Sequence, residues 1–451
     1  MVRMIILAAA LLFAPALLAQ ETAPKNVIIF IGDGMGFNHV EATDYYLTGT
    51  KDSSPFAAFE TAVAASTYSA ENDGTPTGYD PEQAWTSLAY LKARYTDSGA
   101  AGTALATGEK TYDGAIGVGV DERRLTNLLE VAEELGKATG VATSVQLSHA
   151  TPAAFVAHNP NRRDYVGIAR EMFLDSDVDL IMGAGHPLYD GSGELADDPN
   201  YDYVGGEAVW NALLAGETSV AVEEGERSIG DADGDGAPDA WTLVETRGDF
   251  VALSEGETPK RVAGVVRNGS TLQANREPSS EAPFETPFVE TIPTLAEMTA
   301  AALNVLDDDP DGFVLMIEGG AIDWASHAND KSRLIEETAD FYDAIRAAAT
   351  WAEHNGATNE TLVVVTADHE CGALWGETPL SPVENNGEGA LPTMTFFSDS
   401  HTNALVPLYA TGPGAEAFHE YANETDPKRG AYVDNTEIPR VIMSLLRGKA
   451  K

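Results

Sequence analysis

Five short, largely apolar stretches recur along the chain without the alternation of apolar and polar positions that marks a half-exposed strand. Such stretches are typical of strands buried on both faces, as in a parallel sheet. Residues 125–135 instead have helical periodicity and end at Gly136. Alternation of buried strands with amphipathic helices over this length predicts one large α/β domain. The predicted strands are 26–31, 140–145, 178–182, 313–317 and 362–366.

The segment 187–291 interrupts this rhythm, because it is acidic, rich in turn residues and only weakly periodic. We expect it to be an insertion or small subdomain on the α/β body, or else a set of elaborated loops. Residues 282–294 are rich in Pro and Glu and are expected to connect it back to the body. The predicted organisation is a single domain over 20–451 with this one interruption.

The 451-residue chain carries 27 Lys and Arg against 71 Asp and Glu, which gives a formal net charge of −44. An excess of this size argues against stable binding to nucleic acid or to an anionic membrane through a basic surface. It suits a soluble protein in a salty medium that screens the charge, and charge alone suggests a halophilic or marine source. Cys371 is the only cysteine, so no intrachain disulfide can form.

The first 19 residues have the layout of a secretory signal peptide. Arg3 precedes an apolar run over 4–18, and small residues stand at Ala16 and Ala19, near which we expect cleavage. The protein is then exported, to the periplasm or outside the cell. The run is short for a membrane span, so no membrane partner is expected, and an uncleaved N-terminal anchor is the alternative.

Acidic and imidazole side chains follow three of the predicted strands. Asp33 lies in a glycine-rich turn after the first strand, and Glu318 directly follows the fourth. Asp368 and His369 come one residue after the last. Open α/β sheets bind ligands at the carboxyl ends of their strands. A charged residue at the end of a buried apolar run needs a partner there, and a cation supplies one.

Asp323 and His327 are four residues apart on a helix that we expect to start after two glycines, so their side chains share one face. This spacing can clamp a metal ion, although on its own it is more often a surface pair. His401 lies in a polar loop, where a lone histidine is usually not a ligand. Together with the strand-end residues, these side chains form a mixed N/O donor set suited to Zn²⁺ beside a harder ion such as Mg²⁺. Two ions roughly 4 Å apart would clamp the attacking and leaving oxygens of a phosphoryl transfer.

Asp97 and Ser98 open a run of small residues and are expected to be the N-cap and first residue of a helix. The hydroxyl then lies at the positive end of the helix dipole, which favours anions, although an ordinary capped helix is the plain alternative. Thr151 before Pro152 indicates another helix start, with a hydroxyl that could ligate a hard metal. Arg162 follows soon after, and its guanidinium can take two phosphate oxygens at once.

One turn of the acidic segment alternates carboxylates before a glycine, as in the first half of a calcium-binding loop. The bidentate Glu that ends such a loop is replaced by Thr242, so a solvated acidic turn is an equally good interpretation. The candidate Ca²⁺ ligands are Asp231, Asp233, Asp235 and Asp239.

A set of motifs resembles those of the alkaline phosphatase family, in the family's order and over nearly the whole mature chain. Each motif is moderately specific alone, but chance does not explain the ordered set. The motifs are NVIIFIGDGMG (26–36), YTDSGAAGTALATG (95–108), HATPAAFVAH (149–158) with Arg162, IEGGAIDWASH (317–327), VTADHE (365–370) and HTNALVPLYATGPGA (401–415).

The resemblance implies a metal-dependent hydrolase that acts on small phosphomonoesters and releases inorganic phosphate through a phosphoserine intermediate. Ser98 would be the nucleophile. Arg162, steadied by Asp97, would hold the non-bridging phosphate oxygens. The family fold is a central, mostly parallel sheet with helices on both faces, usually in a homodimer.

The resemblance also implies two Zn²⁺ sites and one Mg²⁺ site. The ligands would be Asp323, His327 and His401 for the first zinc; Asp33, Asp368 and His369 for the second, which would ionise Ser98; and Asp33, Thr151 and Glu318 for magnesium. His149 and Trp324 would flank the magnesium site, as in a variant of marine and cold-living bacterial members. Cys371 is expected to be a small buried thiol, because a cysteine ligand is not part of the family's pattern.

Two other interpretations compete with this one. The first is a phosphodiesterase or sulfatase of the same superfamily, but diesterases tend to use threonine, and sulfatases use a modified cysteine or serine in a different motif. The second is a secreted metal-binding protein that kept the fold and lost catalysis. An intact Ser98 and a full ligand set argue against it.

Overall fold

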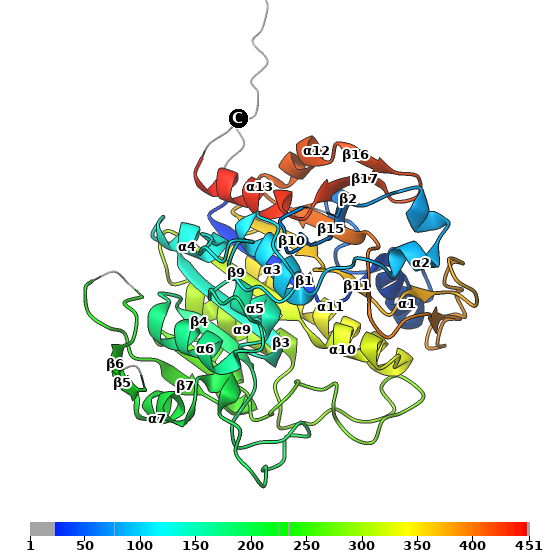
Figure 1. The fold of residues 1–451 in the computed structure, drawn as a ribbon. Helices are drawn as coiled ribbons and strands as arrows, with labels where there is room; N and C mark the ends of the chain where they lie inside the picture. The colour runs from blue at the N-terminus through cyan, green and yellow to red at the C-terminus, as the bar shows by residue number, and fades with distance from the viewer. Residues whose placement is uncertain (1–22, 76, 224, 233–234, 449–451) are drawn as a thin grey trace, which may run out of the picture.

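The computed structural model describes residues 23–448 apart from 76, 224 and 233–234. Its main element is an 11-stranded sheet with helices on both faces (Figure 1). The α/β prediction is therefore confirmed. From edge to edge the strands are β16 (Glu424–Asp426), β17 (Gly430–Asp434), β2 (Thr61–Ser66), β15 (Val406–Thr411), β10 (Thr361–Thr366), β1 (Asn26–Gly32), β9 (Phe313–Gly319), β3 (Ala138–Gln146), β4 (Leu180–Ala184), β8 (Val262–Val265) and β7 (Thr242–Val244).

All neighbouring strands from β10 through β7 pair in parallel, whereas β15 is antiparallel to both β10 and β2. The five predicted strands correspond to β1, β3, β4, β9 and β10, with ends displaced by one or two residues. Every residue of β1, β3, β4 and β9 is buried, as the lack of alternation predicted.

Helices cover both faces of this sheet (Figure 1). The predicted helix 125–135 is shorter in the structure, because Asn127 caps it and exchanges hydrogen bonds with Glu130 in a capping box. The helices of one face are α9 (Leu295–Leu306) and α11 (Lys331–His354), with α1 (Phe37–Thr48) against α11; those of the other are α3 (Ser98–Thr107), α4 (Leu128–Glu133), α5 (Ala150–Ala154) and α13 (Glu437–Leu446).

Residues 187–291 contribute the two strands β7 and β8 to the main sheet, so this part of the segment belongs to the α/β body. The remainder holds the helices α7 (Glu207–Ala215) and α8 (Arg247–Leu253), a hairpin of β5 (Ser219–Val222) and β6 (Gly225–Ser228), and loops. The division of the chain into a body and an insertion stays a prediction.

Two carboxylates of the acidic turn are engaged within the protein. Asp231 accepts hydrogen bonds from the backbone N–H groups of Asp235 at 3.1 Å and Gly236 at 2.6 Å. Asp239 pairs with Lys260 at 2.7 Å. Asp233 lies outside the described residues. Calcium binding by this turn stays a prediction.

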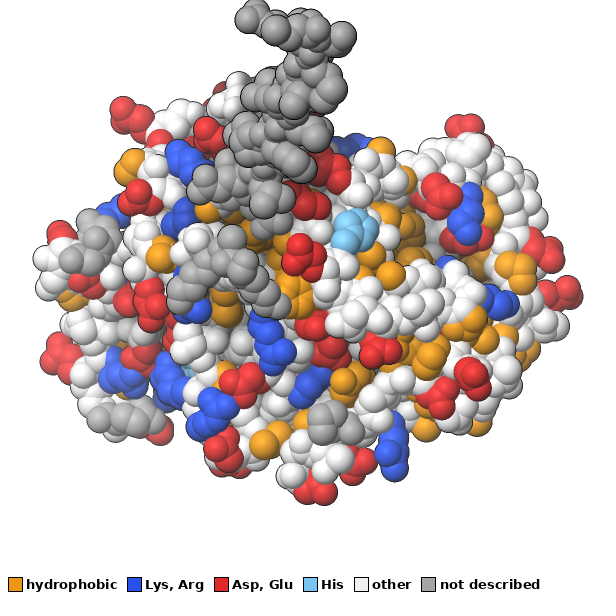
Figure 2. Space-filling model, turned by 90° about the horizontal axis from the view of Figure 1, so that it is seen from above, with side chains coloured by type: hydrophobic (Ala, Val, Ile, Leu, Met, Phe, Trp, Pro, Cys, Tyr) orange, Lys and Arg blue, Asp and Glu red, His pale blue; other side chains and the backbone are white. Residues whose placement is uncertain are grey.

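The signal peptide predicted at 1–19 also lies outside the described residues. Within the described part of the chain, no helix is both long and apolar enough to cross a membrane. On the face seen in Figure 2, acidic side chains are interspersed with Lys and Arg. The negative charge is thus spread over this face and not gathered into one patch.

Candidate metal and phosphate site

Asp33, Glu318 and Asp368 lie at the carboxyl ends of the adjacent strands β1, β9 and β10. The register aligns Ile31 with Glu318 on one side and with Thr366 on the other. All three carboxylates are fully buried, and no hydrogen-bond donor among the described residues faces either oxygen of Asp33. Burial and then the charge of Asp368 raise the pKa of Asp33 well above its ordinary value. Buried acids gathered in this way need a cation to neutralise them.

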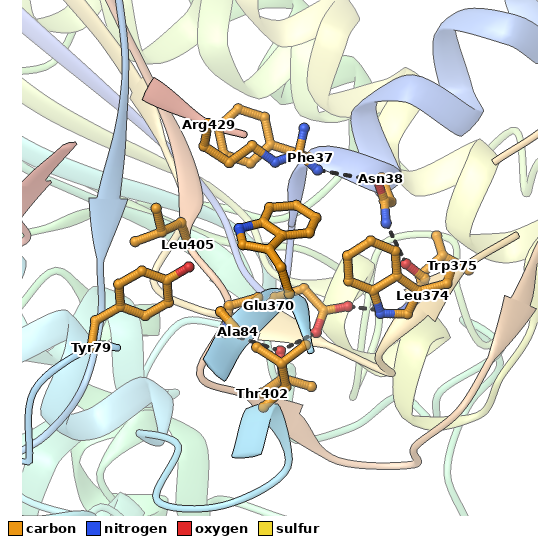
Figure 3. A pocket seen from close by; sticks show the side chains of 13 residues that line it. Phe37, Asn38, Tyr79, Ala84, Glu370, Leu374, Trp375, Thr402, Leu405 and Arg429 are labelled. Atoms are coloured by element: carbon orange, nitrogen blue, oxygen red, sulfur yellow. Dashed lines mark hydrogen bonds between the residues drawn. The ribbon is translucent and has the colours of Figure 1, made fainter. Parts of the chain in front are cut away.

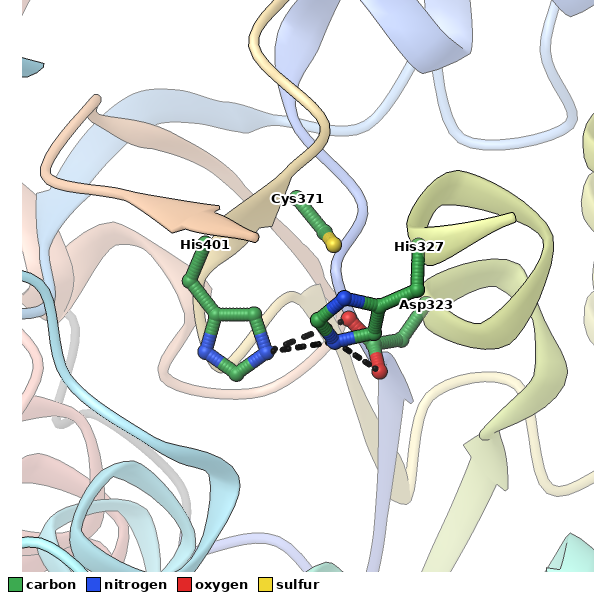
Figure 4. A group of neighbouring side chains, drawn as sticks. All are labelled: Asp323, His327, Cys371 and His401. Carbon is green, nitrogen blue, oxygen red and sulfur yellow. Dashed lines mark hydrogen bonds and ion pairs between the residues drawn. The ribbon is translucent and has the colours of Figure 1, made fainter. Parts of the chain in front are cut away.

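A first donor group combines Asp323 and His327 from α10 (Ala321–His327) with His401 from β14 (His401–Thr402) (Figure 4). The two Nε2 atoms of the histidines are 3.1 Å apart. Asp323 Oδ2 is 3.3 Å from His327 Nε2, and Oδ1 is 3.4 Å from His401 Nε2. Tetrahedral ligands about 2.0 Å from one ion lie roughly 3.3 Å apart. The separations in this group are of that size, with a different oxygen of Asp323 facing each histidine.

Backbone carbonyls orient both histidine rings of this group. His327 Nδ1 lies 2.6 Å from the carbonyl oxygen of Asp399, and His401 Nδ1 lies 2.8 Å from that of Thr96. A carbonyl can only accept, so each Nδ1 carries the proton and each Nε2 presents a lone pair to the other. Two lone pairs at this distance need a shared cation. The hydrogen bond with Asp323 raises the pKa of His327 to about 9.

A second donor group surrounds His369 and includes the nucleophile candidate. His369 Nε2 is 3.1 Å from Asp368 Oδ2 and 3.6 Å from Asp33 Oδ1. Donor atoms of Asp33, Asp323 and His369 all lie within 4.8 Å of one another. Ser98 Oγ is 3.2 Å from His369 Nε2. An ion held by this group would therefore lie next to the serine hydroxyl.

A third cluster of oxygen donors surrounds Glu318. Thr143 donates a short hydrogen bond to its Oε2, while Oε1 has no partner among the described residues. Burial raises the pKa of Glu318 to about 7, against the hydrogen bond from Thr143, which lowers it. The half-buried ring of His149 lies 5.8 Å from that of Trp324. Hard oxygen ligands with a buried charge suit Mg²⁺.

Asp97 connects the serine to the arginine. It is the N-cap of α3, and its Oδ1 accepts hydrogen bonds from the N–H groups of Ala100 at 2.9 Å and Gly114 at 3.0 Å. Its Oδ2 accepts a hydrogen bond from Arg162 Nη1 at 2.7 Å. The predicted capped helix is confirmed, and Ser98 is its first residue. The remaining guanidinium N–H groups of Arg162 are available to an anion.

Asp97, Ser98 and Arg162 open onto a cleft of about 650 Å³. Arg162 lines this cleft, whereas its neighbour Arg163 is exposed on the surface. The cleft is lined by Tyr95, Asp97, Ser98, His149, Arg162, Asp323, Trp324, His327, Ala328, Ser400 and His401.

Comparison with known proteins identifies this arrangement. The family model described as alkaline phosphatase matches residues 24–439. The chain belongs to the alkaline phosphatase family. It is 31% identical to alkaline phosphatase 3 of Bacillus subtilis, over 95% of this chain and 90% of that one. It is 29% identical to the alkaline phosphatase of Escherichia coli, over 90% of this chain and 85% of that one.

Solved structures of the alkaline phosphatase family share the fold. The enzyme of the Antarctic bacterium TAB5 superimposes with a TM-score of 0.63 at 25% identity, over 95% of this chain and 99% of that one. A histidine-to-glutamate variant of the same enzyme, with Mg bound in a site named M3, has a TM-score of 0.64 at 25% identity over the same shares. The cold-active enzyme of a Shewanella species has a TM-score of 0.65 at 24% identity, over 93% of this chain and 99% of that one.

Two details of this alkaline phosphatase site were not predicted correctly from the sequence: the start of the helix at Thr151 and the role of Thr143. The helix expected to start at Thr151 begins at Ala150, after His149, because the chain turns at the end of β3. Thr143 was not a candidate residue, yet the register of β3 against β9 places it directly opposite Glu318. The sequence offers one indication of Thr143, namely that a polar residue occurs within a buried strand.

A small cavity of about 30 Å³ is lined in part by Phe37, Glu370 and Thr402 (Figure 3). Glu370, which follows His369, accepts hydrogen bonds there from Leu374 N at 3.0 Å and from Thr402 Oγ1. Arg429 lies over the ring of Phe37, 4.2 Å from its centroid. These contacts brace β11 (Glu370–Cys371) against β14, and so support the backbone beside His401.

Proposed function

We propose that this member of the alkaline phosphatase family hydrolyses phosphomonoesters through a phosphoserine on Ser98, with two Zn²⁺ ions and one Mg²⁺ ion. The proposed ligands are Asp323, His327 and His401 for the first zinc; Asp33, Asp368 and His369 for the second; and Asp33, Thr151 and Glu318 for magnesium, beside His149 and Trp324. The Mg-bound structure of the TAB5 variant supports a magnesium site in such a scaffold.

The observation that carries the proposal is the position of Ser98. Its Oγ lies 3.2 Å from a candidate zinc ligand, at the N-terminus of α3 and in the same cleft as Arg162. A serine hydroxyl is a weak nucleophile at its free pKa. Bound divalent ions supply the missing chemistry, because they lower the pKa of hydroxyls and water and stabilise oxyanions.

The chain's own residues bind and orient the substrate. Arg162, fixed by Asp97, can hold two non-bridging oxygens of the phosphate through its fork of N–H donors. This orientation directs Ser98 Oγ at phosphorus, in line with the leaving oxygen. The first displacement forms the Ser98–phosphate bond and breaks the ester bond, and the proton that Ser98 gives up passes through water to the leaving oxygen, which departs as the alcohol. In the second displacement water breaks the Ser98–phosphate bond, so configuration at phosphorus is retained overall.

The remaining parts of the proposal are supported by the composition of the chain and by the family resemblance. We propose that residues 1–19 direct export and that the net charge of −44 adapts the protein to salt. We further propose a homodimer, on the family resemblance.

The decisive assay compares a phosphomonoester with a phosphodiester, using metal-loaded wild type and Ser98→Ala. The proposal expects turnover of the monoester by wild type at least about 10⁴-fold faster than by Ser98→Ala, because the nucleophile supplies a separate reaction path. Preferential cleavage of the diester would identify a diesterase. Stoichiometric phosphate release without turnover would identify a binding protein.

A further inference from the structure

Cys371, the only cysteine, lies within the first metal-donor group although its residue type gave no reason to expect it there. Its Sγ and one donor atom each of Asp323, His327 and His401 all lie within 4.8 Å of one another (Figure 4). The side chain is fully buried. The backbone fixes it, since Cys371 N donates to the carbonyl of Gly34 at 3.0 Å and Cys371 pairs with His401 between β11 and β14.

Asp323 has an unsatisfied oxygen in the same group. The side chain is 7% exposed, and Oδ1 receives no hydrogen bond among the described residues. Carboxylates that ligate a metal are normally hydrogen-bonded in turn, and these outer contacts hold the ligand in the orientation that the ion requires. A protonated thiol is a weak donor of the kind needed.

We propose that Cys371 is a positioning residue, whose thiol donates to Oδ1 of Asp323 and fixes this carboxylate toward the first zinc. Cys371 does not line the cleft onto which Ser98 and Arg162 open, so it approaches Asp323 from the buried side. A zinc ion held by Asp323 would then keep its cleft side free for a phosphate oxygen, as a catalytic zinc site requires. This inference rests on the proposed function, because it assumes an ion at Asp323.

The test compares Cys371→Ala, which removes the donor, with Cys371→Ser, which keeps a donor on a side chain of similar size. Each full-length variant is loaded with zinc, and retained zinc is measured against increasing chelator. We expect the apparent zinc affinity of Cys371→Ala to fall by roughly 10- to 100-fold, the usual effect of losing such a contact. Cys371→Ser stays close to wild type. Thermal unfolding of the metal-free proteins checks that both variants keep the fold.

Four outcomes would overturn the inference. Wild-type zinc affinity in Cys371→Ala would show that the thiol does not position Asp323. Equal losses of zinc affinity in Cys371→Ala and Cys371→Ser would show that the Cys371 side chain acts only through packing. A thiolate-to-metal charge-transfer band in the cobalt-substituted wild type would make the sulfur a direct ligand instead. A wild type that binds no zinc at all would overturn the proposed function as well, so the two failures are distinguishable.

Discussion

Substitution of Asp97 tests whether one carboxylate serves both the helix and the phosphate site. Oδ1 accepts the hydrogen bonds of Ala100 N and Gly114 N, whereas Oδ2 accepts that of Arg162. Asp97→Ala removes all three contacts. Asp97→Asn can keep Oδ1 as the cap but presents an N–H₂ group to Arg162, which has donors only. The pair of variants therefore separates stability from phosphate binding.

The structure gives different magnitudes for the two effects. Loss of the N-cap lowers the free energy of unfolding by about 1 kcal/mol, and loss of the bond to Gly114 lowers it by about 1 kcal/mol more. We expect about 2 kcal/mol for Asp97→Ala from these contributions. Asn is as good an N-cap as Asp, so Asp97→Asn keeps the cap. The Asp97 and Arg162 side chains are each 20% exposed, and their ion pair therefore contributes less than about 1 kcal/mol to the free energy of unfolding. Asp97→Asn is thus nearly as stable as wild type.

Both variants release Arg162 from its fixed orientation. If about 1–2 kcal/mol of positioning is lost, the KM for a phosphomonoester and the inhibition constant of inorganic phosphate rise by roughly 5- to 30-fold. The value of kcat changes little, because the guanidinium contacts the same oxygens in the bound substrate and in the transition state. The loss therefore falls on binding and not on chemistry.

Steady-state kinetics with a chromogenic monoester, phosphate inhibition and thermal unfolding measure these quantities. Asp113→Asn is the matched control, because Asp113 accepts a hydrogen bond from Asp97 N at 3.4 Å and its substitution leaves the Asp97–Arg162 pair intact. Unchanged KM and phosphate inhibition in both Asp97 variants would refute the reasoning. If KM and the phosphate inhibition constant rose equally in Asp113→Asn, the loss of a negative charge near Arg162 would explain the result, and not the loss of the Asp97–Arg162 contact.

Three further predictions concern charge. Burial raises the pKa of Asp33 above its ordinary value, that of Asp368 to about 6 and that of Glu318 to about 7. Between the unfolded and folded pKa values, the metal-free folded state therefore holds protons that the unfolded state releases. The Tm of chelator-treated protein should fall as pH rises from about 4 to 7, and equal pH dependence with metals bound would contradict this. Burial likewise raises the pKa of Glu337 to about 8. Glu337→Gln should be more stable than wild type at alkaline pH and similar near pH 5 in chemical denaturation, and no difference at alkaline pH would count against it. Because the net charge is −44, kcat/KM for a phosphate dianion should rise with added salt at low ionic strength, and a flat response would exclude long-range repulsion as a limit on capture.

The central sheet could be predicted because its strands have a strong local signal. β1 and β9 are unbroken apolar runs, and Asp33 and Glu318 mark their ends. The edges were harder to predict, since β7 and β8 are only three and four residues long and lie in an acidic, turn-rich segment. β8 joins the sheet by pairing with β4 and β7 by pairing with β8, and no local pattern records either contact.

The candidate site divides in the same way. Asp323 and His327 share a helix face, so their spacing alone brings them together. His401 joins them only because β14 pairs with β11, and this contact is between distant parts of the chain. The resemblance to the family's motifs predicted His401 as a ligand, whereas residue spacing could not. Neither route indicated Thr143 or the orientation of Cys371, because strand register and side-chain packing decide both.

The most direct test of the account traps the covalent intermediate. Metal-loaded protein is mixed with a phosphomonoester, quenched in acid, digested and analysed by mass spectrometry. The account predicts a phosphorylated peptide modified at Ser98, absent from Ser98→Ala and from chelator-treated protein. Hydrolysis with no phosphate on any residue, or with phosphate on a residue other than Ser98, would contradict it.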